Sequence, residues 1–401
     1  MKKIIAFTVC LLSLYNANAQ ENVITTGVPF LLVAADARAA GMGDNGVATS
    51  SDAYSQQWNP AKYAFALTKQ GFSLSYTPYL VELVNDISLG QVTYFNKLNE
   101  RSAFGASFRY FSVGEIELRT DFDAPVYIVK PAEYAIDLSY SLKLSEMFSM
   151  AVAGRYINSS LAIPSEGQDN SAASSFAIDV AGFYQSEEIA FNDFNGKWRA
   201  GFNFQNMGPK INYDLNTSSD AGSNFLPANM KLGGGFDFIL DDYNKVALNL
   251  EISKLMVPTP PAYVEPVDSN GNGKIDTDES LAANEENSQN IIDYNNIGWF
   301  EGMIQSFSDA PGGFSEELQE ITYSVATEYK YQDAFAVRLG YFYENENKGA
   351  RQFFSLGAGF AYNIMKLDVS YLFSTSNVIN PLENTLRFSL SFAIGEKYEE
   401  Y

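Results

Sequence analysis

The segment "EYAIDLSYSLKL", residues 133–144, alternates large apolar side chains with small or polar ones throughout its length. Ile136 and Leu138 fall on one face, while Asp137 and Ser139 fall on the other. Successive side chains of a β-strand point to opposite faces, so the segment predicts a strand with one apolar and one polar side. Strands of soluble proteins are mostly about 5–6 residues long, which makes this one unusually long.

The same alternation recurs along most of the chain and predicts fourteen strands. These are residues 71–80, 86–97, 102–114, 133–144, 147–159, 174–186, 197–207, 229–240, 244–254, 320–332, 334–345, 351–363, 365–376 and 384–395. Their typical length is what a tilted membrane-crossing strand requires, roughly 9–11 residues or slightly more. An even number of strands is also typical of bacterial single-chain barrels.

The connections between these segments alternate in length. Those after the second, fourth, eighth, tenth and twelfth strands are short ("KLNE", "SE", "DDY", "D" and "N"), and only the one near 187–196 is longer than its place predicts. Short turns on one side and long loops on the other are typical of barrels in outer-membrane lipid, with the long loops extracellular. We expect these loops at 115–132, 160–173, 208–228 and 255–319. A large soluble β-sandwich or propeller is the alternative, but no blade-like repeat is present.

The amino-terminal residues 1–19 have the pattern of a secretory signal peptide. Lys2 and Lys3 precede a short apolar run, and Ala17-Asn18-Ala19 forms a cleavage site. Without this segment the chain has no cysteine, and the whole sequence has no histidine. Thiolate and histidine catalysis and Cys- or His-ligated metals are therefore excluded, and we expect no enzyme.

The balance of charge excludes a further class of function. Removal of residues 1–19 leaves 24 basic and 48 acidic residues, a net charge of −24. Nucleic-acid binding depends on neutralising phosphates with Lys and Arg, so we expect no nucleic-acid partner. An ordinary solvated acidic surface accounts for most of this charge.

Residues 20–70 lack the alternating pattern and are rich in small residues. Within them, "WNPA" (Trp58, Asn59, Pro60 and Ala61) predicts a turn, because Pro60 fixes φ and Asn59 suits the position before it. The ring of Trp58 could anchor this turn on a barrel wall. We therefore expect a plug at 20–70 inside the lumen, a barrel at 71–395 and a tail at 396–401.

The run "DARAAGMGDNGVATSSDAYSQQWNPAKYA", followed by fourteen strands, resembles the FadL-like barrel superfamily. There an Asn-Pro-Ala motif belongs to the plug, which here implies Asn59, Pro60 and Ala61. The Ala-Arg-Ala-Ala-Gly-Met-Gly run and the whole layout resemble, more narrowly, the PorV (LptO) family of the type IX secretion system of Bacteroidetes. The resemblance implies an outer-membrane protein that binds the C-terminal domains of secreted cargo at a large translocon channel. It would then pass the cargo to a surface attachment complex that contains a sortase-like protein.

The FadL-like resemblance also implies an alternative function, transport of hydrophobic small molecules through the lumen. The three glycines at 233–235 could kink a strand and open the wall for such transport. The side chains expected to face the lumen are, however, strongly polar. They include Asp137, Lys143, Arg155, Asp179, Arg199, Arg338, Asp368 and Arg387. A third reading, lipopolysaccharide deacylation, is implied by the LptO name, but no constellation of residues for hydrolysis is recognisable.

The longest predicted loop contains the sharpest chemical motif, "DSNGNGKIDTDE", residues 268–279. It fits the twelve-residue EF-hand loop, with Gly273 at the sharp turn. The expected ligands of a structural Ca²⁺ are Asp268, Asn270, Asn272, the carbonyl of Lys274, Asp276 and Glu279. Four prolines precede the loop and exclude an entering helix, so the motif would be half of an EF-hand. A polar turn without an ion is the alternative.

The segment that follows, "NIIDYNNIGWFEGMIQSF", carries apolar residues at helical spacing. They are Ile297, Trp299, Phe300, Met303, Ile304 and Phe307. An apolar stripe in an external loop must be covered by something. The sequence leaves two possibilities open, packing over the barrel mouth or docking on a partner protein.

Overall fold

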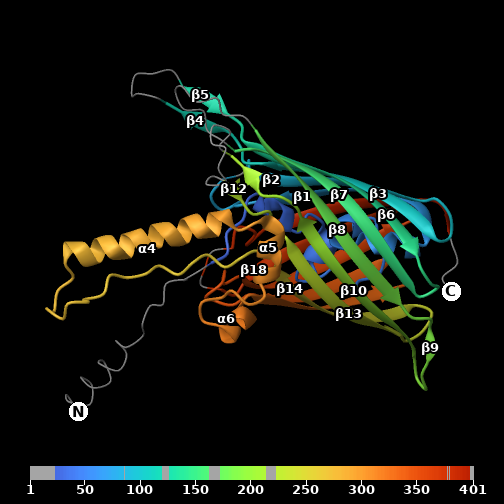
Figure 1. The fold of residues 1–401 in the computed structure, drawn as a ribbon. Helices are drawn as coiled ribbons and strands as arrows, with labels where there is room; N and C mark the ends of the chain where they lie inside the picture. Colours follow the sequence, from blue (N-terminus) through green and yellow to red (C-terminus); the bar gives the residue numbers. More distant parts are fainter. Residues whose placement is uncertain are drawn as a thin grey trace, which may run out of the picture.

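Fourteen long antiparallel strands form a closed barrel in the computed structural model of the protein (Figure 1). The structure describes residues 23–84, 86–119, 126–161, 172–213, 223–376, 378 and 380–397. The predicted signal peptide and most of the predicted tail lie outside the described residues.

The barrel strands follow the predicted segments closely. They are β1 (Thr68–Pro78), β2 (Ser88–Lys97), β3 (Ser102–Ser112), β6 (Ala132–Lys143), β7 (Phe148–Ser160), β8 (Ala173–Gln185), β10 (Asn195–Met207), β13 (Asn229–Ile239), β14 (Asn244–Leu255), β15 (Ile321–Tyr331), β16 (Phe335–Tyr343), β17 (Gln352–Tyr362), β18 (Met365–Ser374) and β19 (Leu386–Lys397). Each strand pairs with its neighbours in this order, and pairing of β1 with β19 closes the ring. The predicted fourteen-stranded barrel is confirmed.

Alternation along each strand separates a lipid-facing side from a luminal side. In β6, Leu138 is 64% exposed on the outside, whereas its neighbour Asp137 is fully buried inside the barrel. A closed barrel is one of the few structures that satisfies every backbone polar group within a bilayer, because it has no open edge. The apolar outer face and polar inner face therefore both follow from the period of two.

Five short strands were not predicted. They are β4 (Ile116–Leu118), β5 (Tyr127–Val129), β9 (Ile189–Ala190), β11 (Ile211–Asn212) and β12 (Ser223–Asn224). β4 pairs with β5 and β11 with β12 in the long connections, while β9 extends the β8–β10 hairpin. The β9 extension accounts for the longer connection near 187–196. Strands of two or three residues carry too little alternation to be recognised in a sequence.

The amino-terminal segment lies inside the barrel as short helical pieces joined by turns (Figure 1). These are η1 (Pro29–Leu32), α2 (Ala37–Ala40), α3 (Ser55–Trp58) and η2 (Pro60–Phe65). We call the described residues 23–67 the plug. Because β1 begins at Thr68, the last three residues of the predicted plug belong to the first strand. Most plug side chains are buried, and many are alanines, which suits a segment enclosed by a wall of fixed diameter.

The longest connection forms an arm at the end of the barrel that carries the long loops (Figure 1). It contains α4 (Thr277–Asn296), α5 (Trp299–Gln305) and α6 (Phe314–Gln319), and we call residues 256–320 the outer arm. The helix α4 was not predicted, although Asp276 and Glu279 form the capping box that marks its start. None of the described helices combines the length and apolar character of a membrane span.

Candidate functional site

The turn at Trp58–Ala61 is held by the side chain of Asn59, which is fully buried. Asn59 Nδ2 donates to the carbonyl oxygens of Val47 at 2.9 Å and Gly182 at 3.0 Å, while its Oδ1 accepts from the Ala61 N–H at 3.1 Å. Pro60 occupies the first position of η2, where its missing N–H costs nothing. The predicted turn therefore joins two plug segments and the wall strand β8.

The ring of Trp58 packs mainly within the plug. Its Nε1 donates to Asp36 Oδ2 at 2.6 Å, and the ring lies against Gly46, where an added Cβ would come within 2.3 Å of it. Asp36 also caps α2 by accepting from the Ala39 N–H at 2.8 Å. One wall residue reaches the ring, because the ammonium of Lys231 lies 5.1 Å from its centroid.

Hydrogen bonds tie the plug to the wall on all sides. Eleven of the fourteen barrel strands (β1, β2, β3, β6, β7, β8, β10, β14, β15, β17 and β19) form at least one such bond. Glu251 of β14, for example, accepts from the N–H groups of Gly46 and Val47 at 2.8 and 2.9 Å. Any displacement of the plug would break many of these bonds together.

Glycines bring the plug backbone into direct contact with two wall strands. A Cβ at Gly340 of β16 would lie 2.1 Å from backbone atoms of Met42 and Gly43. A Cβ at Gly41 would lie 2.8 Å from the Cα of Gly357 on β17. Side chains at these positions would hold the plug away from the wall, so the glycines permit the observed approach.

Buried ion pairs line the lumen as the predicted polar wall implied. Arg38 of the plug pairs with Glu328 at 3.0 Å and with Asp52 at 2.5 Å. Glu328 also pairs with Arg338 at 2.7 Å, and Arg338 pairs with Asp368 at 2.8 Å.

A second luminal network joins Arg109, Asp137, Arg155 and Asp179. Burying a charge is costly unless it is paired, so each such network fixes the residues that form it.

The three glycines at 233–235 do not kink their strand. β13 pairs with β10 and β14 along its whole length, without a change of register. Gly233 faces the plug, where an added Cβ would lie 2.5 Å from a methyl group of Val47. The strand therefore lacks the kink that these glycines could have supplied. Gly233 instead makes room for Val47 of the plug, and a Cβ at Gly235 would meet Asn249 of the wall.

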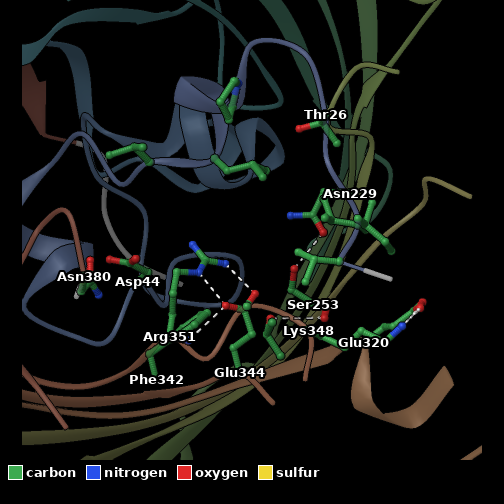
Figure 2. Close-up of a pocket in the computed structure, with 18 of the residues that line it drawn as sticks. Thr26, Asp44, Asn229, Ser253, Glu320, Phe342, Glu344, Lys348, Arg351 and Asn380 are labelled. Carbon is green, nitrogen blue, oxygen red and sulfur yellow. Dashed lines mark hydrogen bonds and ion pairs between the residues drawn. The ribbon is translucent and has the colours of Figure 1, made fainter. Parts of the chain in front are cut away.

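Above the plug, a cavity of about 460 Å³ opens at the end of the barrel that carries the long loops. We call this cavity the vestibule. Plug residues such as Leu32, Val33 and Trp58 line it from below. Its charged side chains are Asp44 of the plug, Lys231 of β13, Glu320 of the outer arm, and Glu344, Lys348 and Arg351 of the β16–β17 connection. Figure 2 shows several of them around the cavity. Its volume lies within the range of ligand pockets, about 300–1,000 Å³. A smaller cavity of about 260 Å³, at the opposite end, is lined by Asp52, Lys330 and other residues.

Ion pairs fix the charged side chains of the vestibule. Arg351 donates to Glu344 from Nε at 2.8 Å and from Nη2 at 3.0 Å (Figure 2). Lys348 pairs with Glu320 at 3.0 Å, which joins the barrel to the base of the outer arm. Together with Lys231 and Asp44, these residues place charges of both signs around one amphipathic cavity. The cations are Lys231, Lys348 and Arg351, and the carboxylates are Asp44, Glu320 and Glu344.

The predicted apolar stripe is partly packed and partly exposed. α5 packs through Gly302 against Pro258 of the outer arm and Phe225 of the connection before β13. Phe300 and Ile304, on the other side, are 59% and 62% exposed. Trp299 and Phe307 are exposed to a smaller degree, while Met303 and Ile297 are half-buried. The stripe therefore contributes to packing of the arm and also leaves an apolar surface open.

The predicted calcium loop is folded by its own side chains. Asp268 accepts from the backbone N–H groups of Gly271 and Gly273 at 2.8 and 2.7 Å, and both glycines have positive φ. Glu279 accepts from the N–H groups of Ser269 and Asp276 at 2.7 and 3.0 Å. These hydrogen bonds, chiefly the one from Asp276, lower the pKa of Glu279.

The potential ligands of this loop converge only in part. Asn270 and Asn272 both donate through Nδ2 to Asp276 Oδ2, at 2.9 and 2.7 Å. Nowhere in the described part of the chain do three or more His, Cys, Asp or Glu side chains stand close enough to hold a metal ion. The donor set is rich in oxygen, as Ca²⁺ requires, and its carboxylates would have to move together to bind it.

Replacing Asn59 with alanine is expected to destabilise the barrel measurably. The change leaves the carbonyls of Val47 and Gly182 and the N–H of Ala61 without the partner that Asn59 provides. Each unsatisfied buried group lowers the free energy of unfolding by about 1–3 kcal/mol. We expect a lower midpoint for heat-induced loss of the compact, fast-migrating form on a gel. Asn195→Ala removes an exposed bond to Glu188 and serves as the control. Equal midpoints for the two variants would contradict the assigned role of Asn59.

Comparison with known proteins gives one family and a set of structures. Residues 16–262 match the family model described as "Type IX secretion system protein PorV". A search of curated proteins gives no match. Among solved structures, a Pseudomonas putida toluene transporter, TodX, is 9% identical, with a TM-score of 0.49, covering 90% of this chain and 98% of that one.

Two other solved structures also match over nearly their whole length. A deletion mutant of the TodX monoaromatic hydrocarbon channel is 10% identical, with a TM-score of 0.48 and coverage of 90% and 98%. A Pseudomonas aeruginosa FadL homologue is 12% identical, with a TM-score of 0.43 and coverage of 93% and 99%.

Proposed function

The chain belongs to the PorV family of the type IX secretion system, and from this premise we propose that it is a carrier of secreted proteins. As a member of this family it is an outer-membrane β-barrel of the secretion system. The proposed finer function is to bind the C-terminal domain of cargo at the translocon channel and pass it to the surface attachment complex with its sortase-like protein.

The fixed plug is the observation that carries this proposal. Eleven strands hold the plug by hydrogen bonds, and wall glycines hold its backbone against the barrel. A barrel filled in this way is suited to be a rigid support for external loops. Transport of hydrophobic molecules would need the plug to move or the wall to open, but the plug is bonded to the wall and β13 is paired along its whole length. The ion-paired wall behind the plug would also offer such molecules poor binding.

The outer arm is the surface that we propose for docking on partner proteins. Phe300 and Ile304 expose an apolar patch on α5, and exposed patches of this kind often mark interaction sites. Trp299 and Phe307 extend it, and such aromatic residues are enriched in the core of protein interfaces. The large channel and the cargo are the proposed partners of the arm, and outer-membrane lipid surrounds the barrel.

We propose no catalytic activity for the protein. The sequence lacks histidine, and its one cysteine lies at position 10, within the predicted signal peptide. Luminal carboxylates such as Glu328, Asp179 and Asp368 are held in ion pairs with arginine, which suits a structural role better than proton transfer.

The proposed carrier function is tested by purifying the tagged protein from detergent-solubilised outer membrane and identifying what accompanies it by mass spectrometry. We expect a very large channel protein and secreted proteins that share a C-terminal domain. A variant with Phe300 and Ile304 both changed to serine should retain the folded barrel but lose most of these proteins. Recovery of the barrel with lipid or fatty ligand alone would refute the carrier function.

We also propose that the loop at 268–279 binds a structural Ca²⁺ through Asp268, Asn270, Asn272, the Lys274 carbonyl, Asp276 and Glu279. A Kd of about 10⁻⁴–10⁻³ M, as in other extracellular modules, would suffice outside the cell. The ion would offset the repulsion between the carboxylates of Asp268, Asp276 and Glu279 and fix the start of α4.

Trypsin offers a direct measurement of calcium binding, because Lys274 is the only basic residue of the outer arm. We expect Ca²⁺ to slow cleavage after Lys274 by about tenfold or more, since each 1.4 kcal/mol of ordering changes the open population tenfold. Glu279→Gln should abolish this dependence on Ca²⁺, whereas Asp278→Asn at the neighbouring position should preserve it. Cleavage that proceeds at one rate with and without the ion would rule out the site.

A further inference from the structure

The vestibule is a cavity with one open end. Its floor belongs to the plug, which is tied to the wall on all sides, and its mouth opens beside the outer arm. A chain that runs through the barrel cannot pass such a floor. The vestibule can therefore receive the end of a chain, a loop, a side chain or a small molecule, but not a chain that passes through.

One side of the vestibule is formed by backbone that has no strand partner. Ile24, Thr25 and Thr26 line the cavity, and within the described residues none of them forms a backbone hydrogen bond to another segment. Asn229 and Ser253 of the wall line the same cavity as Thr26 (Figure 2). An extended peptide could bond to this backbone, because unpaired main-chain groups are what strand addition uses.

Two cations that line the vestibule are each held by an ion pair that uses only part of their hydrogen-bonding capacity. Lys231 pairs with Glu251, and Arg351 pairs with Glu344. Behind Asp44, the guanidinium of Arg387 is 99% buried, lies 3.6 Å from Asp44 and has no hydrogen bond from either Nη.

A guanidinium has five donors and an ammonium has three, so Arg351, with two bonds to Glu344, and Lys231, with one to Glu251, each have donors left for a ligand. A group rich in acceptors, such as a carboxylate, would use them.

The remainder of the wall argues against a purely apolar ligand. Val33, Tyr79, Phe342 and Leu382 form an apolar side, but ion pairs interrupt it. An alkyl chain in this cavity would lie against charged groups that gain nothing from it. A short peptide has apolar side chains, which suit the apolar side of the wall, and a polar backbone, which suits its charged and hydrogen-bonding side.

We propose that the vestibule binds the carboxyl-terminal end of a secreted polypeptide, with the terminal carboxylate on Arg351 and Lys231. This inference rests on the proposed carrier function and specifies which part of the cargo enters the barrel. The last residues of the cargo would lie along Ile24–Thr26, with an apolar side chain against Phe342.

Photo-cross-linking in cells producing the full chain tests the proposal. p-Benzoylphenylalanine replaces Phe342 in the vestibule, Trp299 in the outer arm, or Phe354, which faces lipid on β17. We expect Phe342→p-benzoylphenylalanine to cross-link to peptides that contain the last residues of secreted proteins, and the probe at position 354 to give none. Mass spectrometry of the cross-linked peptides identifies them.

Charge variants of the vestibule separate binding from local structure. Arg351→Gln should lower the cross-link yield at position 342 about tenfold or more, the effect of losing a charged hydrogen bond. Glu344→Gln breaks the same ion pair but frees the guanidinium, so the yield should be unchanged or higher. An equal loss in both variants would show a structural role only and overturn the assignment of Arg351.

The probe at Trp299 distinguishes failure of this inference from failure of the carrier function. Cargo cross-linked at 299, with lipid, internal peptides or nothing at 342, would overturn the vestibule site and leave the carrier function intact. Absence of cargo at both positions would refute the carrier function as well.

Discussion

Gly340→Val is expected to prevent formation of the folded, plugged barrel. The new side chain would begin at a Cβ only 2.1 Å from backbone atoms of Met42 and Gly43, whereas non-bonded carbon atoms prefer about 3.5–4.0 Å. Neither partner can rotate away, because both contacts involve backbone. The plug would have to leave β16 and lose neighbouring bonds, including the one from the Gly43 N–H to Ser355 at 2.8 Å.

The measurement for Gly340→Val is the amount of compact, heat-modifiable barrel in outer-membrane fractions. We expect this form to be absent or strongly reduced. Gly154→Val is a matched control, since Gly154 lies on the lipid-facing side of β7 with no atom within 4 Å of an added Cβ. A Gly340→Val barrel as stable as the control would show that the plug is not seated against β16.

Glu328→Gln is expected to destabilise the barrel by about 3–5 kcal/mol, because it removes the partner of buried cations. Glu328 is 2% exposed and pairs with Arg38 at 3.0 Å and Arg338 at 2.7 Å, joining the plug to β15 and β16. In the variant, Arg38 would still pair with Asp52 and Arg338 with Asp368. Each of these buried arginines would, however, have lost one of its two carboxylate partners. Unfolding in urea, followed by tryptophan fluorescence, measures the change.

The control for Glu328→Gln is Asp333→Asn. Asp333 pairs with Lys245 at 2.9 Å in an exposed turn, where such pairs contribute about 0–1 kcal/mol. Equal stability of the Glu328 and Asp333 variants would show that Glu328 is exposed to water and does not depend on its ion pairs with Arg38 and Arg338.

The number, length and order of the barrel strands could be predicted because the residue pattern of each strand depends only on its own surroundings. A strand between lipid and lumen must alternate, so the period of two in segments such as 133–144 identifies both its structure and its faces. Asp137, Arg155 and Arg338 could be assigned to the lumen by the same argument, and all three are buried there. The short turns followed from the close spacing of the strands.

Other features depended on contacts between segments far apart in the chain, which no local pattern records. Gly233 was interpreted as a possible kink, but its role is to accommodate Val47, almost two hundred residues earlier in the sequence. The strands β4, β5, β11 and β12 are too short to show a period of their own. The vestibule was also missed, because its lining comes from the plug, four strands and four of the connections between strands.

The sequence by itself determined that this protein is a plugged, fourteen-stranded outer-membrane barrel with long external loops, since alternation and spacing are local properties. Only the tertiary structure decided that the plug is seated against wall glycines and tied to eleven strands. It also decided that Arg38 forms an ion pair with Glu328 and that Arg351 lines the vestibule. Closure of the barrel brings these groups together, and closure is a property of the whole ring of strands.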